Sequence, residues 1–166
     1  MFDFNRLTVK AQEGLRDAHI KAEALHHQEV APEHYLAALL EQKEGLASAL
    51  VEASGVKVAS IRAVIEEALS KRPQVTSTTG SSDVRLGRDL LALLKDAEAQ
   101  AKKLSDDFVS VEHVFLAAAN NKALKSAGLD ESKLLAGLKK VRGSQRVNSQ
   151  NPEDTYQSLK KYARDL

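Results

Sequence analysis

The residues of this chain that could do chemistry are its five histidines and the carboxylates beside them. Glu33 and His34 lie in "VAPEHYLAALL", and Glu112 and His113 lie in "VSVEHVFLAAA", seventy-nine residues further on. A histidine next to a carboxylate can act as an acid–base pair or bind a metal ion. Both pairs, however, open an expected helix, where the dipole favours a carboxylate and a histidine can bond a neighbouring loop. We expect this helix-start role for both pairs, and a metal or acid–base role is the alternative.

The remaining chemistry-bearing residues form no pattern typical of an active site. His26, His27 and Glu29 crowd one connection without helical metal-ligand spacing, and His19 lies among polar neighbours on a helix. The chain has no phosphate-binding GxxxxGKS/T loop, no serine-hydrolase elbow and no cysteine. We therefore expect that the chain is not an enzyme, with no catalytic residue, no metal and no cofactor of its own.

The composition of the chain indicates which classes of partner it can bind. Lysine and arginine number 24 and aspartate and glutamate 23, well mixed along the chain, which argues against a nucleic-acid partner because that would need a concentrated basic face. No apolar run approaches the ~20 residues that span a bilayer, and the start "MFDFNRLT" is not typical of a signal peptide. Together with the absence of cysteine, this predicts a cytoplasmic protein with no membrane partner.

The elements that position these residues are helices. Apolar periodicity predicts four in the first half: residues 8 to 25, a helix opening at Pro32, residues 46 to 54 and residues 58 to 70. Thr8 fits an N-cap, Pro32 fits the first helical position, and Gly55 fits the left-handed residue that ends a helix.

The same pattern then repeats. "LLKDAEAQAKKL" (93 to 104) aligns with "GLRDAHIKAEAL" (14 to 25) at the offset of seventy-nine, and after a six-residue deletion Gly128 takes the place of Gly55. The prediction is an all-α fold of two tandem four-helix repeats that pack with pseudo-twofold symmetry. The expected parts are repeat one (about 5–70), a linker (71–84) and repeat two (about 85–143), which make one domain over 1–143, followed by 144–166. This last segment is expected to hold a linker and the start of a helix, opened by Asn151 and Pro152, that leads into a further part of the protein.

Three segments carry a family resemblance: "NRLT" near the start, "LSKRPQV" after the fourth helix, and "YQSLKKYARDL" at the end, where Ala163 replaces a usual glycine. With the duplicated Glu-His helix, they make the chain resemble, over its whole length, the Clp N-terminal repeat domain in the disaggregase branch of the Clp ATPases. The repeat alone fits several branches, and the last two segments are the more specific parts.

The resemblance implies a client-binding, regulatory N-terminal domain of an ATP-dependent disaggregase, which engages unfolded or aggregated polypeptides for threading by an ATPase ring. It implies that ATP binds only to ATPase modules outside this chain. It also implies a homohexamer formed through those modules, a monomeric isolated domain and cooperation with the Hsp70 system. The alternative is an adaptor-docking domain of a protease-associated Clp ATPase.

The resemblance also assigns client contact to three positions, Thr8, Asp106 and Glu112. Each has a plainer interpretation: Thr8 as an N-cap, Glu112 as a partner of the helix dipole and Asp106 as a polar loop residue. If the repeats pack about a pseudo-twofold axis, the start of the first helix approaches the other repeat, and the three residues are expected to form a shared polar rim.

The position of an apolar client surface is left open by the sequence. Relatives tend to carry leucines on the outer side of the fifth helix, where this chain has Asp96 and Gln100, which argues against a strong apolar groove there. Phe2, Phe4 and Leu7 are alternative exposed anchors, with a core role as the competing interpretation.

Overall fold

The computed structural model describes residues 2–43, 45–74 and 84–143. Most of the predicted linker and the whole predicted C-terminal helix lie outside these residues. The helices of the first repeat are α1 (Val9–Ala24), α2 (Pro32–Glu41), α3 (Leu46–Ala53) and α4 (Val58–Ser70). Those of the second are α5 (Arg88–Lys103), α6 (Val111–Ala117), α7 (Lys122–Ser126) and α8 (Glu131–Arg142). Short 3-10 turns, η1 (Phe4–Arg6) and η2 (Ala118–Asn120), and two-residue strands, β1 (Glu29–Val30) and β2 (Arg85–Leu86), complete the described part. The all-α fold of two four-helix repeats is confirmed.

Helix ends fall at the capping residues that the sequence indicated. The Thr8 hydroxyl accepts a hydrogen bond from the Ala11 N–H, and Pro32 is the first residue of α2. Gly55 and Gly128 follow α3 and α7 with φ of +85° and +88°, a conformation that L side chains rarely adopt. The repeat aligns these two glycines in the sequence, and the structure shows that they also share one backbone conformation.

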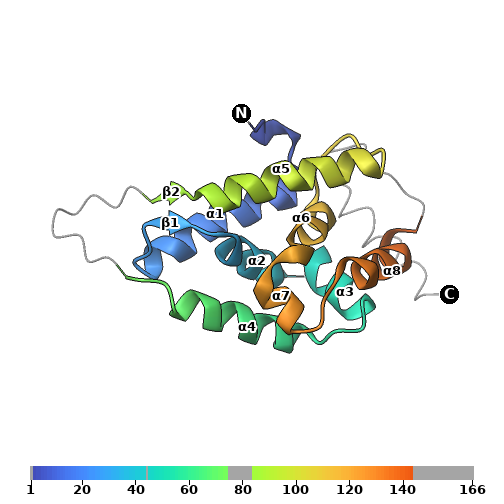
Figure 1. Ribbon diagram of the computed structural model, residues 1–166. Coiled ribbons are helices and arrows are strands. Elements are labelled where there is room, and N and C mark those ends of the chain that lie inside the picture. Colours follow the sequence, from blue (N-terminus) through green and yellow to red (C-terminus); the bar gives the residue numbers. More distant parts are fainter. Residues whose placement is uncertain (1, 44, 75–83, 144–166) are drawn as a thin grey trace.

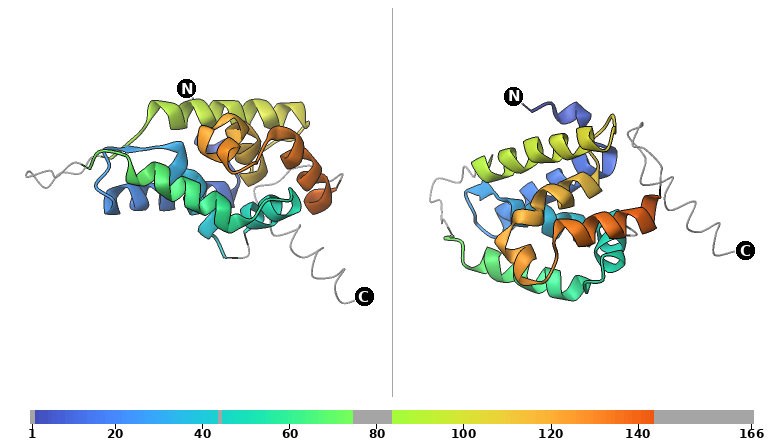
Figure 2. Two further views of the ribbon diagram at one scale, coloured as in Figure 1. Left: turned by 60° about the horizontal axis from the view of Figure 1, so that its bottom comes forward. Right: turned by 45° about the vertical axis from the view of Figure 1, so that its right-hand side comes forward.

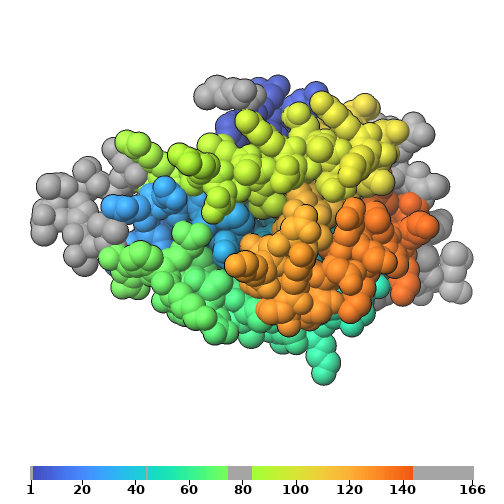
Figure 3. All heavy atoms as spheres, in the orientation of Figure 1, coloured from blue at the N-terminus to red at the C-terminus, as the bar shows by residue number. Residues whose placement is uncertain are grey.

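The two repeats interlock and share one core. Within each repeat the second helix packs against the first and the fourth. Across the repeats, α3 packs against α8 and α4 against α7 (Figures 1 and 2). On the face in Figure 3, the blue segments of the first repeat reach the surface as a strip between α5 and α4 and as the turn at the top. The apolar faces of both repeats are thus buried together.

Gly137 permits the close crossing of α8 and α3. A Cβ at this position would lie 2.5 Å from the Ser54 hydroxyl and 2.9 Å from the Ser54 backbone nitrogen. The absence of a side chain therefore sets how near the second repeat's last helix comes to the first repeat.

Two short backbone pairings join the repeats. In each, a residue before the first helix of one repeat pairs with a residue before the second helix of the other repeat. Val30 in front of α2 pairs with Leu86 in front of α5, and Val109 in front of α6 pairs with Leu7 in front of α1. The offset of seventy-nine converts one pair into the other. Each repeat's first helix is therefore tied at its start to the other repeat, as pseudo-twofold packing requires.

Of the helices in the described ranges, none combines the length and apolarity that crossing a membrane needs.

Candidate functional site

All three residues predicted to contact a client are buried. Thr8 and Glu112 are 0% exposed and Asp106 is 5% exposed. The start of α1 does approach the other repeat, as expected: the Thr8 N–H donates to the Val109 carbonyl at 2.9 Å and the Arg6 guanidinium donates to the Asp107 carbonyl at 3.3 Å. The expected exposed polar rim, however, is not formed, because Thr8, Asp106 and Glu112 all face the interior. Direct contact of these side chains with a client stays an untested prediction.

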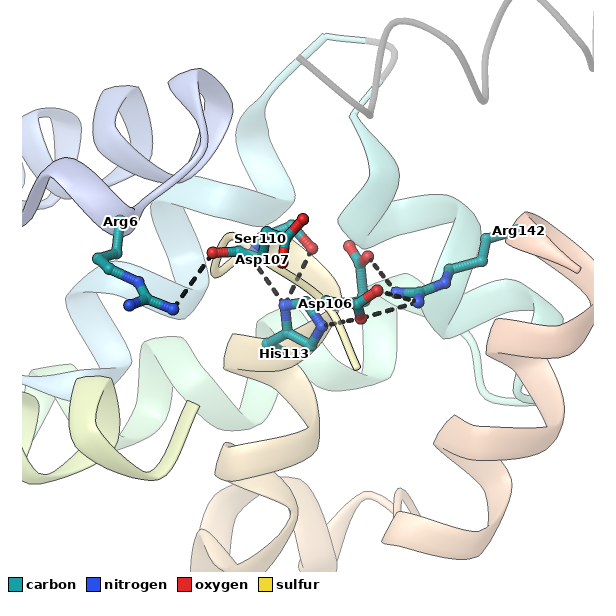
Figure 4. A network of polar contacts seen from close by, with 7 residues as sticks. Arg6, Asp106, Asp107, Ser110, His113 and Arg142 are labelled. Atoms are coloured by element: carbon teal, nitrogen blue, oxygen red, sulfur yellow. Dashed lines mark hydrogen bonds and ion pairs between the residues drawn. The ribbon is translucent and has the colours of Figure 1, made fainter. Parts of the chain in front are cut away.

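Arg142, the last residue of α8, holds Asp106 and Glu112 in a buried ionic cluster (Figure 4). Its Nη2 donates to both Asp106 carboxylate oxygens at 2.7 Å, and its Nη1 donates to Glu112 Oε1 at 2.9 Å. Two buried carboxylates are stabilised by a guanidinium because its fork of donors matches their geometry. The cluster fastens the end of α8 to the first turn of α6 and to the loop in front of it. The sequence gives no local signal for this, since Arg142 lies 36 residues from Asp106.

His113 links this cluster to the start of α6. The Ser110 N–H donates to His113 Nδ1 at 2.9 Å, so the ring proton lies on Nε2, which donates to Asp106 Oδ2 at 2.7 Å. The side chain is fully buried and both ring nitrogens are occupied. The predicted helix-start role of His113 is confirmed, and the ring is not available to a substrate.

Repeat one contains the same arrangement with one substitution. The Ala31 N–H donates to His34 Nδ1 at 2.8 Å, and His34 Nε2 donates to His27 Nδ1 at 2.8 Å. His27 thus takes the place that Asp106 has in repeat two. The sequence reasoning missed this partner, although the offset of seventy-nine aligns His27 with Asp106. No group of three or more metal-ligating side chains occurs among the residues described.

The histidine pair of repeat one is neutral. Burial, then the neighbouring His27 and the nearby Arg72, lowers the pKa of His34 to about 4. Burial, then Arg72, also lowers the pKa of His27. Neutrality agrees with the geometry, because each ring must keep one nitrogen free of hydrogen to accept its bond.

An apolar groove of about 430 Å³ lies on the surface along α1. Its lining residues come from η1, α1 and β2 and the residue that follows η1: Phe4, Asn5, Leu7, Gln12, Leu15, Arg16, His19, Ile20 and Leu86. Phe4 is 37% exposed and Ile20 is 57% exposed, while Phe2 and Leu7 are core residues. Of the three anchors weighed from the sequence, Phe4 alone is exposed.

Two polar side chains of α1 fix the walls of this groove. Gln12 Nε2 donates to the Leu7 carbonyl at 3.0 Å, which holds the end of η1 to α1. His19 Nε2 lies 3.0 Å from the Val84 carbonyl and donates to it, which holds the segment before β2. The outer side of α5, with Asp96, lines only a smaller hollow of about 180 Å³. Of these two hollows, the larger and more apolar one lies along the first helix and not on the fifth.

Comparison with known proteins gives the chain's relatives. The family model described as "Clp repeat (R) N-terminal domain" matches residues 6–125. The chaperone protein ClpB of Bacillus cereus is 39% identical over 170 residues, which cover 99% of this chain and 20% of that protein. The chain thus spans about a fifth of the length of this curated relative.

Solved structures share the fold. The N-terminal domain of Hsp104 from Candida albicans superposes with a TM-score of 0.73 at 21% identity, covering 89% of this chain and 98% of that one. A ClpV N-domain in complex with a VipB peptide superposes with a TM-score of 0.65 at 21% identity, covering 81% of this chain and 86% of that one. The family match spans most of the sequence, and these solved structures share the overall fold of the chain. The chain belongs to the Clp repeat N-terminal domain family.

Proposed function

We propose that this chain is the client-binding N-terminal domain of an ATP-dependent disaggregase and that it engages unfolded or aggregated polypeptides through the groove along α1. The observation that carries the proposal is the exposure of Phe4 and Ile20 at a concave surface lined mainly by apolar side chains. Unfolded chains expose apolar side chains that folded proteins bury, so an apolar groove discriminates between the two.

The rest of the proposed disaggregase corresponds to the part of the relatives' sequences that this chain does not cover. ATP binding, assembly into a homohexamer, threading and cooperation with the Hsp70 system are assigned to that part, in the cytoplasm. In this division of labour the chain itself is not an enzyme and binds no cofactor. The likeness to ClpB along nearly the whole chain supports the assignment to a disaggregase, and the lack of a GxxxxGKS/T loop in this sequence supports placing ATP binding outside it.

The buried cluster is proposed to act on client binding indirectly. Asp106 is fastened to Arg142 and to His113, and Val109 between them pairs with Leu7, which lines the groove. Loss of the cluster would therefore disturb a wall of the groove through the backbone, without any contact between Asp106 and a client.

A defined partner peptide is a second candidate occupant, as in the docking of an adaptor. It is favoured by the ClpV N-domain that was solved with a VipB peptide. An adaptor would bind through one specific segment, whereas a disaggregase client would compete with any other unfolded chain.

Binding of a fluorescently labelled, permanently unfolded protein to residues 1–166 tests the proposal. Ile20→Asp places a charge in the groove and is expected to weaken binding at least several-fold, because the apolar contact is replaced by a solvated carboxylate. Ala99→Asp is the matched control, since Ala99 is the exposed residue at the equivalent position of α5. Equal affinity of the wild type and Ile20→Asp would place client binding elsewhere. Competition by several unrelated unfolded proteins would favour a client surface over an adaptor site.

A further inference from the structure

We infer that the groove along α1 selects apolar segments that carry a carboxylate, and that Arg16 is the residue that recognises this charge. The inference rests on the proposed function, because it names the class of polypeptide that the same groove prefers. It begins from the charges around the groove.

The lining of the groove has a cation and no anion. Among its nine residues, five are apolar, two are amides, and the others are Arg16 and His19. The Arg16 side chain is exposed and makes no ion pair or hydrogen bond with another described residue. An occupant with a carboxylate near Arg16 would complement this charge, and one with a lysine or arginine there would be repelled.

The carboxylates on α1 do not neutralise Arg16. Glu13 lies 3.6 Å from Lys10, and Glu23 lies 3.5 Å from His19. Asp17, as the next residue of the helix, is turned by about 100° from Arg16 around the axis. The guanidinium therefore remains the dominant charge of the groove.

The position of Arg16 suits recognition within a short segment. The α1 residues that line the groove run from Gln12 to Ile20, which corresponds to about 12 Å along the helix. That length matches roughly four residues of an extended chain. Arg16 lies at the middle of this run, so a central carboxylate can reach it while apolar neighbours contact Phe4 and Ile20. The apolar stem of an arginine also packs against such a segment, and the adjoining apolar walls reduce the screening of the ion pair by water.

The other repeat provides a matched control. Lys95 on α5 is the counterpart of Arg16 and is also exposed. Its surroundings differ, because the counterpart of Ile20 is Ala99 and the counterpart of Leu15 is the fully buried Leu94. A cation without an apolar groove is thus present on the same molecule.

The test uses residues 1–166 and three labelled peptides that share one apolar sequence and differ in a central Glu, Gln or Lys. The Glu peptide is expected to bind roughly two- to fivefold tighter than the Gln peptide, the range of a modest ion pair, and the Lys peptide weaker than both. The preference should shrink at high salt. Arg16→Gln should remove the difference between peptides, Arg16→Glu should invert it, and Lys95→Gln should leave it unchanged. Thermal melts of the variants should match the wild type because both side chains are exposed.

The outcomes separate this inference from the proposed function. If the three peptides bind equally well and Ile20→Asp weakens all of them, the groove binds clients without charge selection, and the inference is overturned alone. A uniform loss for all three peptides in Arg16→Gln also overturns it, since Arg16 would then contribute only packing. If Ile20→Asp changes the binding of none of them, the groove is not the site, and the proposed function fails together with the inference.

Discussion

His27 and Asp106 occupy equivalent positions in the two repeats, and each accepts the hydrogen bond of the histidine that opens the second helix. In repeat one the acceptor is a neutral imidazole, and in repeat two it is a carboxylate that also binds Arg142. The two repeats therefore share one hydrogen-bonded arrangement but differ in the charge of the acceptor. They are expected to respond differently to acid and to mutation.

The histidine pair predicts a loss of stability in mild acid. The pKa of His34 is lowered from 6.5 to about 4 in the folded chain, so the unfolded state binds more protons between these values. The free energy of unfolding is expected to fall as the pH drops below 6.5, by a total on the order of 3 kcal/mol near pH 4. Urea unfolding at a series of pH values measures this. His34→Gln should flatten the dependence between neutral pH and about pH 5, and His26→Asn, at an exposed neighbour, should not. An unchanged slope in His34→Gln would assign the effect to other groups.

Asp106→Ala is expected to destabilise the domain by about 3–5 kcal/mol, because it leaves part of the buried Arg142 charge uncompensated and removes the acceptor of His113. The family resemblance assigned Asp106 to client contact, and its burial makes a loss of stability the expected result of this substitution. Thermal and urea unfolding provide the measurement. Asp107→Ala is the control, since that exposed side chain should alter stability by less than about 0.5 kcal/mol. A wild-type melt for Asp106→Ala would contradict a structural role of the cluster.

Thr8→Ala removes the N-cap of α1 and is expected to cost about 1 kcal/mol of stability, because the Ala11 N–H loses its partner in a buried place. Thr8→Ser keeps the hydroxyl and should retain most of the stability. Denaturant midpoints of the two variants and the wild type provide the comparison. Equal losses in both variants would mean that the Thr8 methyl group, and not the cap, matters.

Gly137→Ala is expected to cost roughly 1–3 kcal/mol, because the added Cβ would lie 2.9 Å from the Ser54 backbone nitrogen and the helices α8 and α3 would have to move apart. Ala136→Ser, at the adjacent exposed position, is the matched control. Thermal unfolding compares the two variants. A neutral Gly137→Ala would mean that the crossing adapts without loss.

Calorimetric titration of residues 1–166 with ATP and Mg²⁺ is expected to give no saturable heat. The physical reason is that the sequence lacks the glycine-rich loop whose backbone N–H groups surround phosphates. Micromolar binding would contradict the proposed division between this chain and the ATPase part.

The features that the sequence predicted well are local ones. Thr8, Pro32 and Gly55 each act through a neighbour within one helical turn, so a short stretch of sequence is enough to assign them. The helix-start roles of His34 and His113 belong to the same class, since each ring bonds a backbone N–H three residues earlier. The offset of seventy-nine added the equivalence of the repeats, because a duplicated pattern reports a duplicated unit wherever its halves pack.

What the tertiary structure alone decided is which side chains are exposed and which distant residues meet. The burial of Asp106 and Glu112 depends on Arg142, which reaches them from the end of α8, and no periodicity connects a loop with a helix end so far along the chain. The groove likewise combines Phe4 of the N-terminal turn with Leu86 of the other repeat, whose meeting follows from the exchanged pairing in front of α1 and α5. The sequence by itself determined the helices, their caps, the repeat and the family. The polar cluster and the client groove required the folded chain, because burial and ion pairing depend on the spatial neighbours that packing supplies and not on sequence neighbours.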